Sequence, residues 1–161
     1  LSDRTVDLLI EAGFDYESSL FSDDVPMMLD NGRGTLVELP VPAAIDDYNQ
    51  YVCSRSFDHL MSISTPEDAV RVFKAEFDAM WAHGGLWLSV WHPAVSGRLS
   101  RAIAIRSLVE SMRERGNVWF ASHAQVAAHV RGLIARGEWS PRVDRLPYYP
   151  EVPIPEARHL V

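Results

Sequence analysis

Apolar residues recur along the chain at two different spacings, and the spacing divides the chain into predicted helices and strands. Repeats at three and four residues predict four helices, over about residues 3–12, 66–83, 100–115 and 122–135. Thr65 followed by Pro66, and Ser122 followed three residues later by Gln125, are typical of helix starts. Short apolar runs predict three strands, over residues 35–41, 86–91 and 118–120.

The run at 86–91 is almost wholly apolar, as expected for a strand covered on both faces. Turn-forming residues fill 14–34, which we expect to be a long loop with at most a short strand near 14–16. For residues 42–65 we expect a loop with at most a short helix. After Gly137, prolines at 141, 147, 150, 153 and 155 exclude a regular helix or a central strand. We expect an extended arm there, over a surface or a partner subunit.

Alternating helices and strands predict an α/β fold with a parallel sheet and crossover helices. Three parallel strands cannot close a barrel, and they leave two open edges. The sequence therefore predicts part of an α/β barrel or sheet over 1–137, with an extended tail over 138–161. We expect Leu1 to be an internal start, and we expect a missing N-terminal half or a homo-oligomer to complete the sheet.

Composition narrows the classes of partner. The chain has 161 residues, which suits one domain, and its 15 Lys and Arg against 22 Asp and Glu give a net charge of −7. This charge disfavours nucleic acid as a partner. Cys53 is the only cysteine, which excludes an internal disulfide and fits a reducing, cytoplasmic environment. No apolar run has the roughly 20 residues that cross a membrane.

His92 is the strongest candidate for chemistry. It ends the apolar run at 86–91, and Pro93 turns the chain away immediately afterwards. In α/β barrels the C-terminal ends of strands line the active site, where a histidine can transfer protons near neutral pH. Asp46 and Asp47 follow the strand at 35–41, so either could bind the imidazole and raise its pKa. The alternatives are a structural histidine and an acidic turn or helix cap.

Three further residues are candidates for substrate binding. Glu38 lies in an apolar strand, where a carboxylate needs a partner; it either faces the site or pairs with an arginine. Arg98, after Ser96 and Gly97, could hold an anionic or sugar oxygen, or could lie at a helix start. Trp91, like Trp87, packs under helices or provides a substrate platform. No metal-protease, phosphate-loop or serine-elbow motif is present, so this segment carries half of an active site and no metal ligands of its own.

Several short segments occur in a fixed order. They are residues 8–20 with Asp23-Asp24, residues 38–41 with Asp46-Asp47, residues 84–88, His92-Pro93 with residues 96–98 and Arg101, and residues 116–121. This order, over about residues 1–130, resembles polysaccharide deacetylases of the NodB-homology family. The similarity is to the branch that contains peptidoglycan deacetylases, deacetylase-like allantoinases and cyclic imide hydrolases.

The resemblance implies the C-terminal portion of a deformed (β/α)7 barrel. It also implies a divalent metal, usually zinc, that is held with the catalytic base by residues upstream of Leu1. His92 would be the general acid that protonates the leaving nitrogen, with Asp46 or Asp47 as its acidic partner. We therefore expect a hydrolase of non-peptide carbon–nitrogen bonds, acting on an N-acetylated sugar or on a small cyclic imide or ureide. The alternative is a degenerate deacetylase domain that binds a glycan or a partner without turnover.

Overall fold

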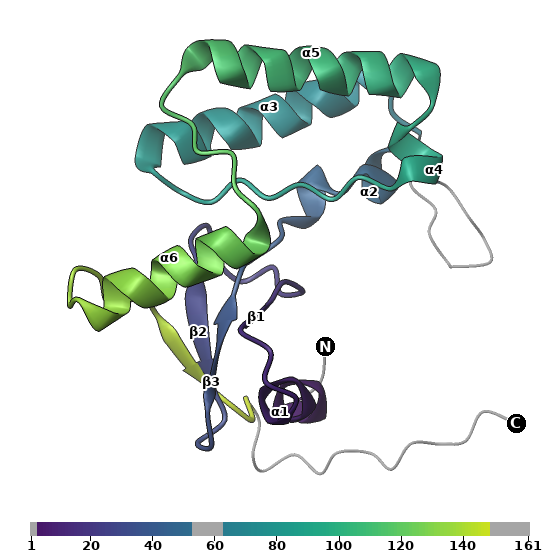
Figure 1. The fold of residues 1–161 in the computed structure, drawn as a ribbon. Helices are drawn as coiled ribbons and strands as arrows, with labels where there is room; N and C mark the ends of the chain where they lie inside the picture. Colours follow the sequence, from purple (N-terminus) through teal and green to yellow (C-terminus); the bar gives the residue numbers. More distant parts are fainter. Residues whose placement is uncertain (1–2, 53–62, 149–161) are drawn as a thin grey trace, which may run out of the picture.

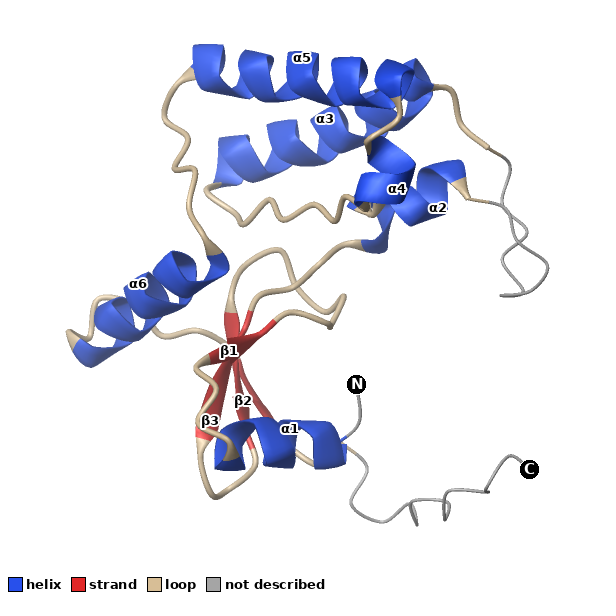
Figure 2. Ribbon diagram, turned by 45° about the vertical axis from the view of Figure 1, so that its right-hand side comes forward, coloured by secondary structure: helices blue, strands red, loops and turns tan. Residues whose placement is uncertain are grey.

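The computed structural model describes residues 3–52 and 63–148 and shows a small sheet beside a group of helices (Figure 1). The sheet lies between helices α1 and α6, whereas α2, α3, α4 and α5 gather on the other side of the molecule (Figure 2). Cys53 and residues 149–161 of the expected arm lie outside the described residues.

The sheet has four strands in the order β1-β3-β2-β4. Their bounds are β1 Tyr16–Glu17, β2 Met27–Asp30, β3 Thr35–Glu38 and β4 Val143–Arg145. β1 pairs parallel with β3, and β2 pairs parallel with β4, but β2 and β3 are antiparallel. The α/β class is therefore confirmed, and the all-parallel sheet predicted from the sequence is wrong.

The antiparallel pair arises from a hairpin inside the predicted long loop. Asn31 accepts hydrogen bonds from the backbone N–H groups of Arg33 and Gly34, and Asp30 accepts one from Gly32. Gly32 has φ of 78°, a left-handed conformation that glycine adopts without strain. These turn residues connect two strands instead of forming a long loop, and the prediction for 14–34 is wrong at β2.

The two faces of the sheet are covered by different helices because strand side chains alternate in direction. α1 (Asp3–Glu11) packs on one face and α6 (His123–Ala135) on the other. The α1 face comprises Val6, Met27, Leu29 and Leu36. The α6 face comprises Met28, Val37, Leu39, Ala127 and Val130. Both clusters are buried, so the sheet forms the middle of three layers.

The second core lies between α3 (Pro66–His83) and α5 (Leu99–Arg115), which run side by side (Figures 1 and 2). Its buried residues are Ile45, Tyr51, Ala69, Phe73, Phe77, Leu108 and Met112. Three short elements surround this core: a 3₁₀ turn at Ala43–Ile45, α2 (Asp47–Tyr51) and α4 (Pro93–Ser96). The four helices predicted from periodicity are confirmed, and so is the short helix allowed within 42–65.

Two predicted strands are not formed. In the region of 86–91 the structure has a single parallel bridge, between Asp46 and Val90, and residues 118–120 are in no strand. A strand needs a neighbour to complete its hydrogen-bond ladder. Residues 86–91 are half-buried, and the side chains of Trp119 and Phe120 are 58% and 54% exposed. The described residues therefore form an open sheet, without a closed barrel.

The proline-rich tail takes part in the sheet as far as it is described. β4 lies between Pro141 and Pro147 and pairs only with β2, so it is an edge strand. Proline tolerates such positions because an edge strand leaves one side free of ladder bonds. Within residues 3–52 and 63–148, no helix combines the length and apolar character needed to span a membrane.

Candidate functional site

The candidate site lies where the extended segment 86–92 meets the start of α2. The Val90 N–H donates to the Ile45 carbonyl at 3.2 Å, and the Asp47 N–H donates to the Val90 carbonyl at 3.0 Å. The Ser89 hydroxyl donates to the same Ile45 carbonyl at 2.6 Å. These bonds hold the two segments side by side and bring Asp47 next to His92.

The Asp47 carboxylate is bound directly to His92. Its Oδ1 lies 2.6 Å from the ring Nδ1, and its Oδ2 accepts the backbone N–H of His92 at 2.9 Å. The Ser96 hydroxyl donates to the same Oδ2. The Asp47 side chain is 0% exposed, whereas that of His92 is 45% exposed. The pair therefore has a buried, fixed carboxylate and an imidazole that solvent reaches.

The electrostatics of the pair suit proton transfer. The hydrogen bond that the His92 ring donates to Asp47 raises the pKa of His92 above its usual value; burial opposes the shift, and the charges of Asp47 and Asp46 add to it. Because Asp47 occupies Nδ1 as an acceptor, the neutral ring carries its proton on Nδ1. Nε2 is then the ring atom that can exchange a proton with a ligand.

The structure distinguishes between the two adjacent aspartates. Asp46 Oδ1 accepts the Tyr48 N–H at 2.8 Å and caps α2, as an acidic residue at a helix start often does. It lies 3.8 Å from His92 Nδ1, too far for a hydrogen bond. Asp47 is therefore the residue that binds the imidazole, and Asp46 contributes its charge.

Asp46, Asp47 and His92 place three potential metal-ligand atoms within 4.8 Å of one another. Both oxygens of Asp47 nevertheless already accept hydrogen bonds, from the ring, the backbone and Ser96. A metal ion between Oδ1 and Nδ1 would have to displace the 2.6 Å hydrogen bond. The group fits an acid–histidine pair and does not fit a metal site as it is arranged.

Trp91 and Arg98 have different surroundings near His92. Trp91 and His92 line an open hollow of about 280 Å³, to which residues of α5 also contribute. Arg98 is exposed and directly precedes α5. Arg101 is used structurally, because its guanidinium lies 4.3 Å from the centre of the Tyr51 ring and donates to the Val95 carbonyl.

Glu38 lies elsewhere, at the end of β3 and in register with Glu17 of β1. Its side chain is fully buried, and its Oε1 accepts the Leu20 N–H at 2.9 Å. Burial, with further help from Glu17, raises the pKa of Glu38 to about 9. The partner of Glu38 is therefore a second carboxyl group instead of an arginine, and no interaction among the described residues joins it to His92.

Two contacts of the pair were not anticipated from the sequence. Ser96 is buried against Asp47, whereas the sequence indicated only a possible anion contact or a helix cap in this region. Tyr48 lies edge-on to His92, with ring centres 5.6 Å apart. The contact of Ser96 could have been predicted from its spacing to His92. A residue four positions later returns to the same side of a helical turn.

The fold can be compared with solved structures. One is a protein described as a polysaccharide deacetylase from Mycobacterium smegmatis, with 40% identity and a TM-score of 0.77 over 86% of this chain and 47% of that one. The chain belongs to the polysaccharide deacetylase family. PuuE allantoinase has 22% identity and a TM-score of 0.70, over 85% of this chain and 44% of that one.

A third deacetylase-like structure, from Pseudomonas aeruginosa PAO1, has 19% identity and a TM-score of 0.69, over 86% of this chain and 45% of that one. No protein-family model and no curated protein matches the sequence. The chain spans about half the length of these solved relatives. The family expected from the sequence is confirmed, and the chain corresponds to part of a deacetylase domain.

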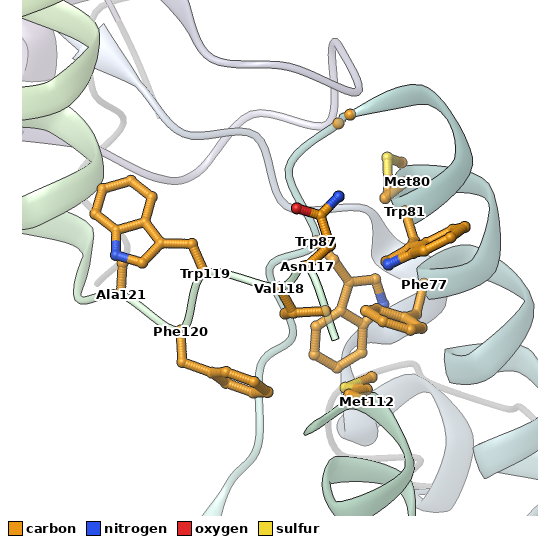
Figure 3. A pocket seen from close by; sticks show the side chains of 12 residues that line it. Phe77, Met80, Trp81, Trp87, Met112, Asn117, Val118, Trp119, Phe120 and Ala121 are labelled. Carbon is orange, nitrogen blue, oxygen red and sulfur yellow. The ribbon is translucent and has the colours of Figure 1, made fainter. Parts of the chain in front are cut away.

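This deacetylase-family chain also has an aromatic hollow of about 370 Å³ between α3, α5 and residues 117–121 (Figure 3). Phe77 and Trp81 of α3 line it together with Trp87, whose indole N–H donates to the Phe73 carbonyl. None of the residues that line it is titratable. This hollow therefore offers aromatic and apolar contacts, whereas the Asp47–His92 pair offers titratable groups.

Proposed function

We propose that this chain is the C-terminal portion of a polysaccharide deacetylase-like amidohydrolase that cleaves a non-peptide carbon–nitrogen bond, with His92 as the general acid. The observation that carries the proposal is the 2.6 Å contact between a fully buried Asp47 carboxylate and a half-exposed imidazole. Such a contact fixes the ring and favours its protonated form near neutral pH. The family supports the reaction class.

The proton transfer follows from the chemistry of amide cleavage. Water adds to the carbonyl carbon, and the carbon–nitrogen bond breaks only when the departing nitrogen acquires a proton. His92 donates that proton from Nε2, while Asp47 stabilises the imidazolium through Nδ1. The products are a carboxylic acid and an amine. The divalent metal that the family implies would activate the water, and its ligands are expected outside this chain.

For the substrate, we propose an N-acetylated sugar or a small cyclic amide. The Mycobacterium structure is described as a polysaccharide deacetylase, and the PuuE protein is an allantoinase. The hollow beside His92 offers the Trp91 ring as an apolar wall. Arg98, which is exposed and directly follows Gly97 of that hollow, is our candidate for binding an oxygen of the substrate.

We also propose that an N-terminal half completes a deformed (β/α)7 barrel. Supporting this, the chain covers 47% of the Mycobacterium protein. The half-buried run at 86–91 and the exposed Trp119 and Phe120 offer the apolar surface that further strands would cover.

The test uses the protein with its complete domain, and N-acetylglucosamine oligomers and allantoin as probes. Release of acetate or opening of the ureide ring is measured for the wild type, for His92→Ala and for His83→Ala, an exposed histidine at the end of α3. Turnover that is lost only in His92→Ala supports the proposal. Wild-type turnover in His92→Ala would contradict it, and ligand binding without turnover would indicate the non-catalytic module.

A further inference from the structure

Three donors surround the Asp47 carboxylate and leave neither of its oxygens unused. Oδ1 binds the His92 ring, and Oδ2 accepts both the His92 backbone N–H and the Ser96 hydroxyl. Ser96 is itself buried. A buried carboxylate with both oxygens bound cannot rotate without breaking hydrogen bonds in a place where water replaces them poorly.

The local sequence places Ser96 for this contact. Pro93 begins α4, and the Ser96 N–H donates to the His92 carbonyl at 2.8 Å, which closes one helical turn. This turn brings the Ser96 side chain next to the His92 backbone N–H. A Cβ atom at Gly97 would collide with the Pro93 carbonyl oxygen, so glycine permits the tight exit.

We infer that Ser96 is a positioning residue for His92. Its hydroxyl holds Oδ2 of Asp47, so that Oδ1 remains aimed at Nδ1 and the ring keeps its proton there. This inference rests on the proposed function only for its catalytic consequence. The arrangement itself requires no substrate, because all its contacts lie within this chain.

The tautomer of His92 reports this role directly. A free neutral imidazole favours the form that carries its proton on Nε2, and an acceptor fixed at Nδ1 reverses that preference. If Ser96 holds the acceptor, removing its hydroxyl lets Asp47 turn and returns part of the population to the Nε2–H form. A serine that only fills space would change stability and leave the tautomer unchanged.

The experiment is ¹⁵N NMR of the His92 ring in the full protein without substrate, above the pKa of the imidazole. Variants are Ser96→Ala, Ser96→Cys, which has a similar size but donates weakly, and Ser96→Thr, which keeps the hydroxyl. Ser111→Ala is the matched control, because it removes a serine hydroxyl bond to the Leu108 carbonyl on α5 and leaves the bonds of Asp47 unchanged. Asp47→Asn gives the signal expected when the acceptor is lost.

We expect a several-fold increase of the Nε2–H form in Ser96→Ala and Ser96→Cys, and wild-type spectra in Ser96→Thr and Ser111→Ala. Where turnover is measured, kcat should fall by about tenfold in Ser96→Ala with KM nearly unchanged. A folded Ser96→Ala or Ser96→Cys protein with the wild-type tautomer would overturn the inference. Absence of turnover would overturn the proposed function alone, because the ring spectra do not depend on it.

Discussion

Asp47 and His92 are 45 residues apart in the sequence, yet Oδ1 of one lies 2.6 Å from Nδ1 of the other. The contact depends on the backbone bonds between Val90, Ile45 and Asp47, which hold the extended segment 86–92 against the start of α2. Disruption of this junction should therefore change the chemistry of the imidazole before it changes the rest of the fold.

The first prediction concerns the carboxylate. Asp47→Asn removes the anion that raises the pKa of His92, so that pKa should fall. A general acid acts only while protonated, and the basic limb of the pH–rate profile should therefore move to lower pH. NMR titration of His92 and the rate profile measure the same shift.

Asp46→Asn is the matched control for that prediction. Its side chain caps α2 and contributes only charge to His92, so its effect on the pKa should be smaller. An equal or larger effect of Asp46→Asn would contradict the assignment of Asp47 as the partner.

A second prediction concerns catalysis. His92→Ala in the complete domain should lower kcat by about 10²–10⁴-fold, the usual contribution of a positioned proton donor. KM should change much less, because the proton is transferred in the transition state. Steady-state kinetics decide the point, and a raised KM with unchanged kcat would instead indicate a role in binding.

Stability should depend on pH through Glu38. Its pKa in the folded protein is about 9, above the ordinary value of 4.5, because the carboxyl is buried beside Glu17. The unfolded chain therefore loses this proton at lower pH than the folded protein does. The contribution to stability is fully present below pH 4.5 and is lost as the pH rises to about 9, by at most about 1.4 kcal/mol per pH unit.

Glu38→Gln tests this dependence, because the amide imitates a neutral carboxyl and can donate to Glu17. Urea denaturation at several pH values should show that the variant gains stability over the wild type as the pH rises. Glu114→Gln, at an exposed position of α5, is the control. Parallel pH curves for the wild type and Glu38→Gln would refute the prediction.

A fourth prediction concerns the exposed aromatic residues. Because Trp119 and Phe120 are more than half exposed, we expect the 161-residue chain alone to self-associate. Replacing both residues by serine should reduce its association in light scattering. Leu99→Ser, at one of the two exposed large apolar residues of α5, should have little effect. A monomeric wild-type chain would contradict this prediction.

The sequence predicted the long helices well because their signals are local. Thr65 and Ser122 cap α3 and α6 as expected, and apolar residues recur on one side of each helix. The strands were harder to predict, because a strand depends on its neighbours. β2 was not predicted, because turn-forming residues surround it. Residues 86–91 have a strand-like sequence but form only one bridge, between Asp46 and Val90.

The sequence predicted the site residues that can be recognised from their own position in the chain, but not the contacts between them. His92 was identifiable from its place after an apolar run. The choice between Asp46 and Asp47 was not, because it depends on where α2 begins. The burial of Ser96 depends on the packing of α4 against α2, which no local pattern contains.

The edge strand β4 has a consequence for biosynthesis. β2 and β3 are adjacent in the sequence, but residues 143–145 must pair with β2 before its outer edge is covered. A growing chain releases the hairpin from the ribosome long before it releases β4. During that interval the backbone groups of β2 are open to pairing with other chains. Nascent-chain folding should therefore be the stage at which this protein most needs a chaperone.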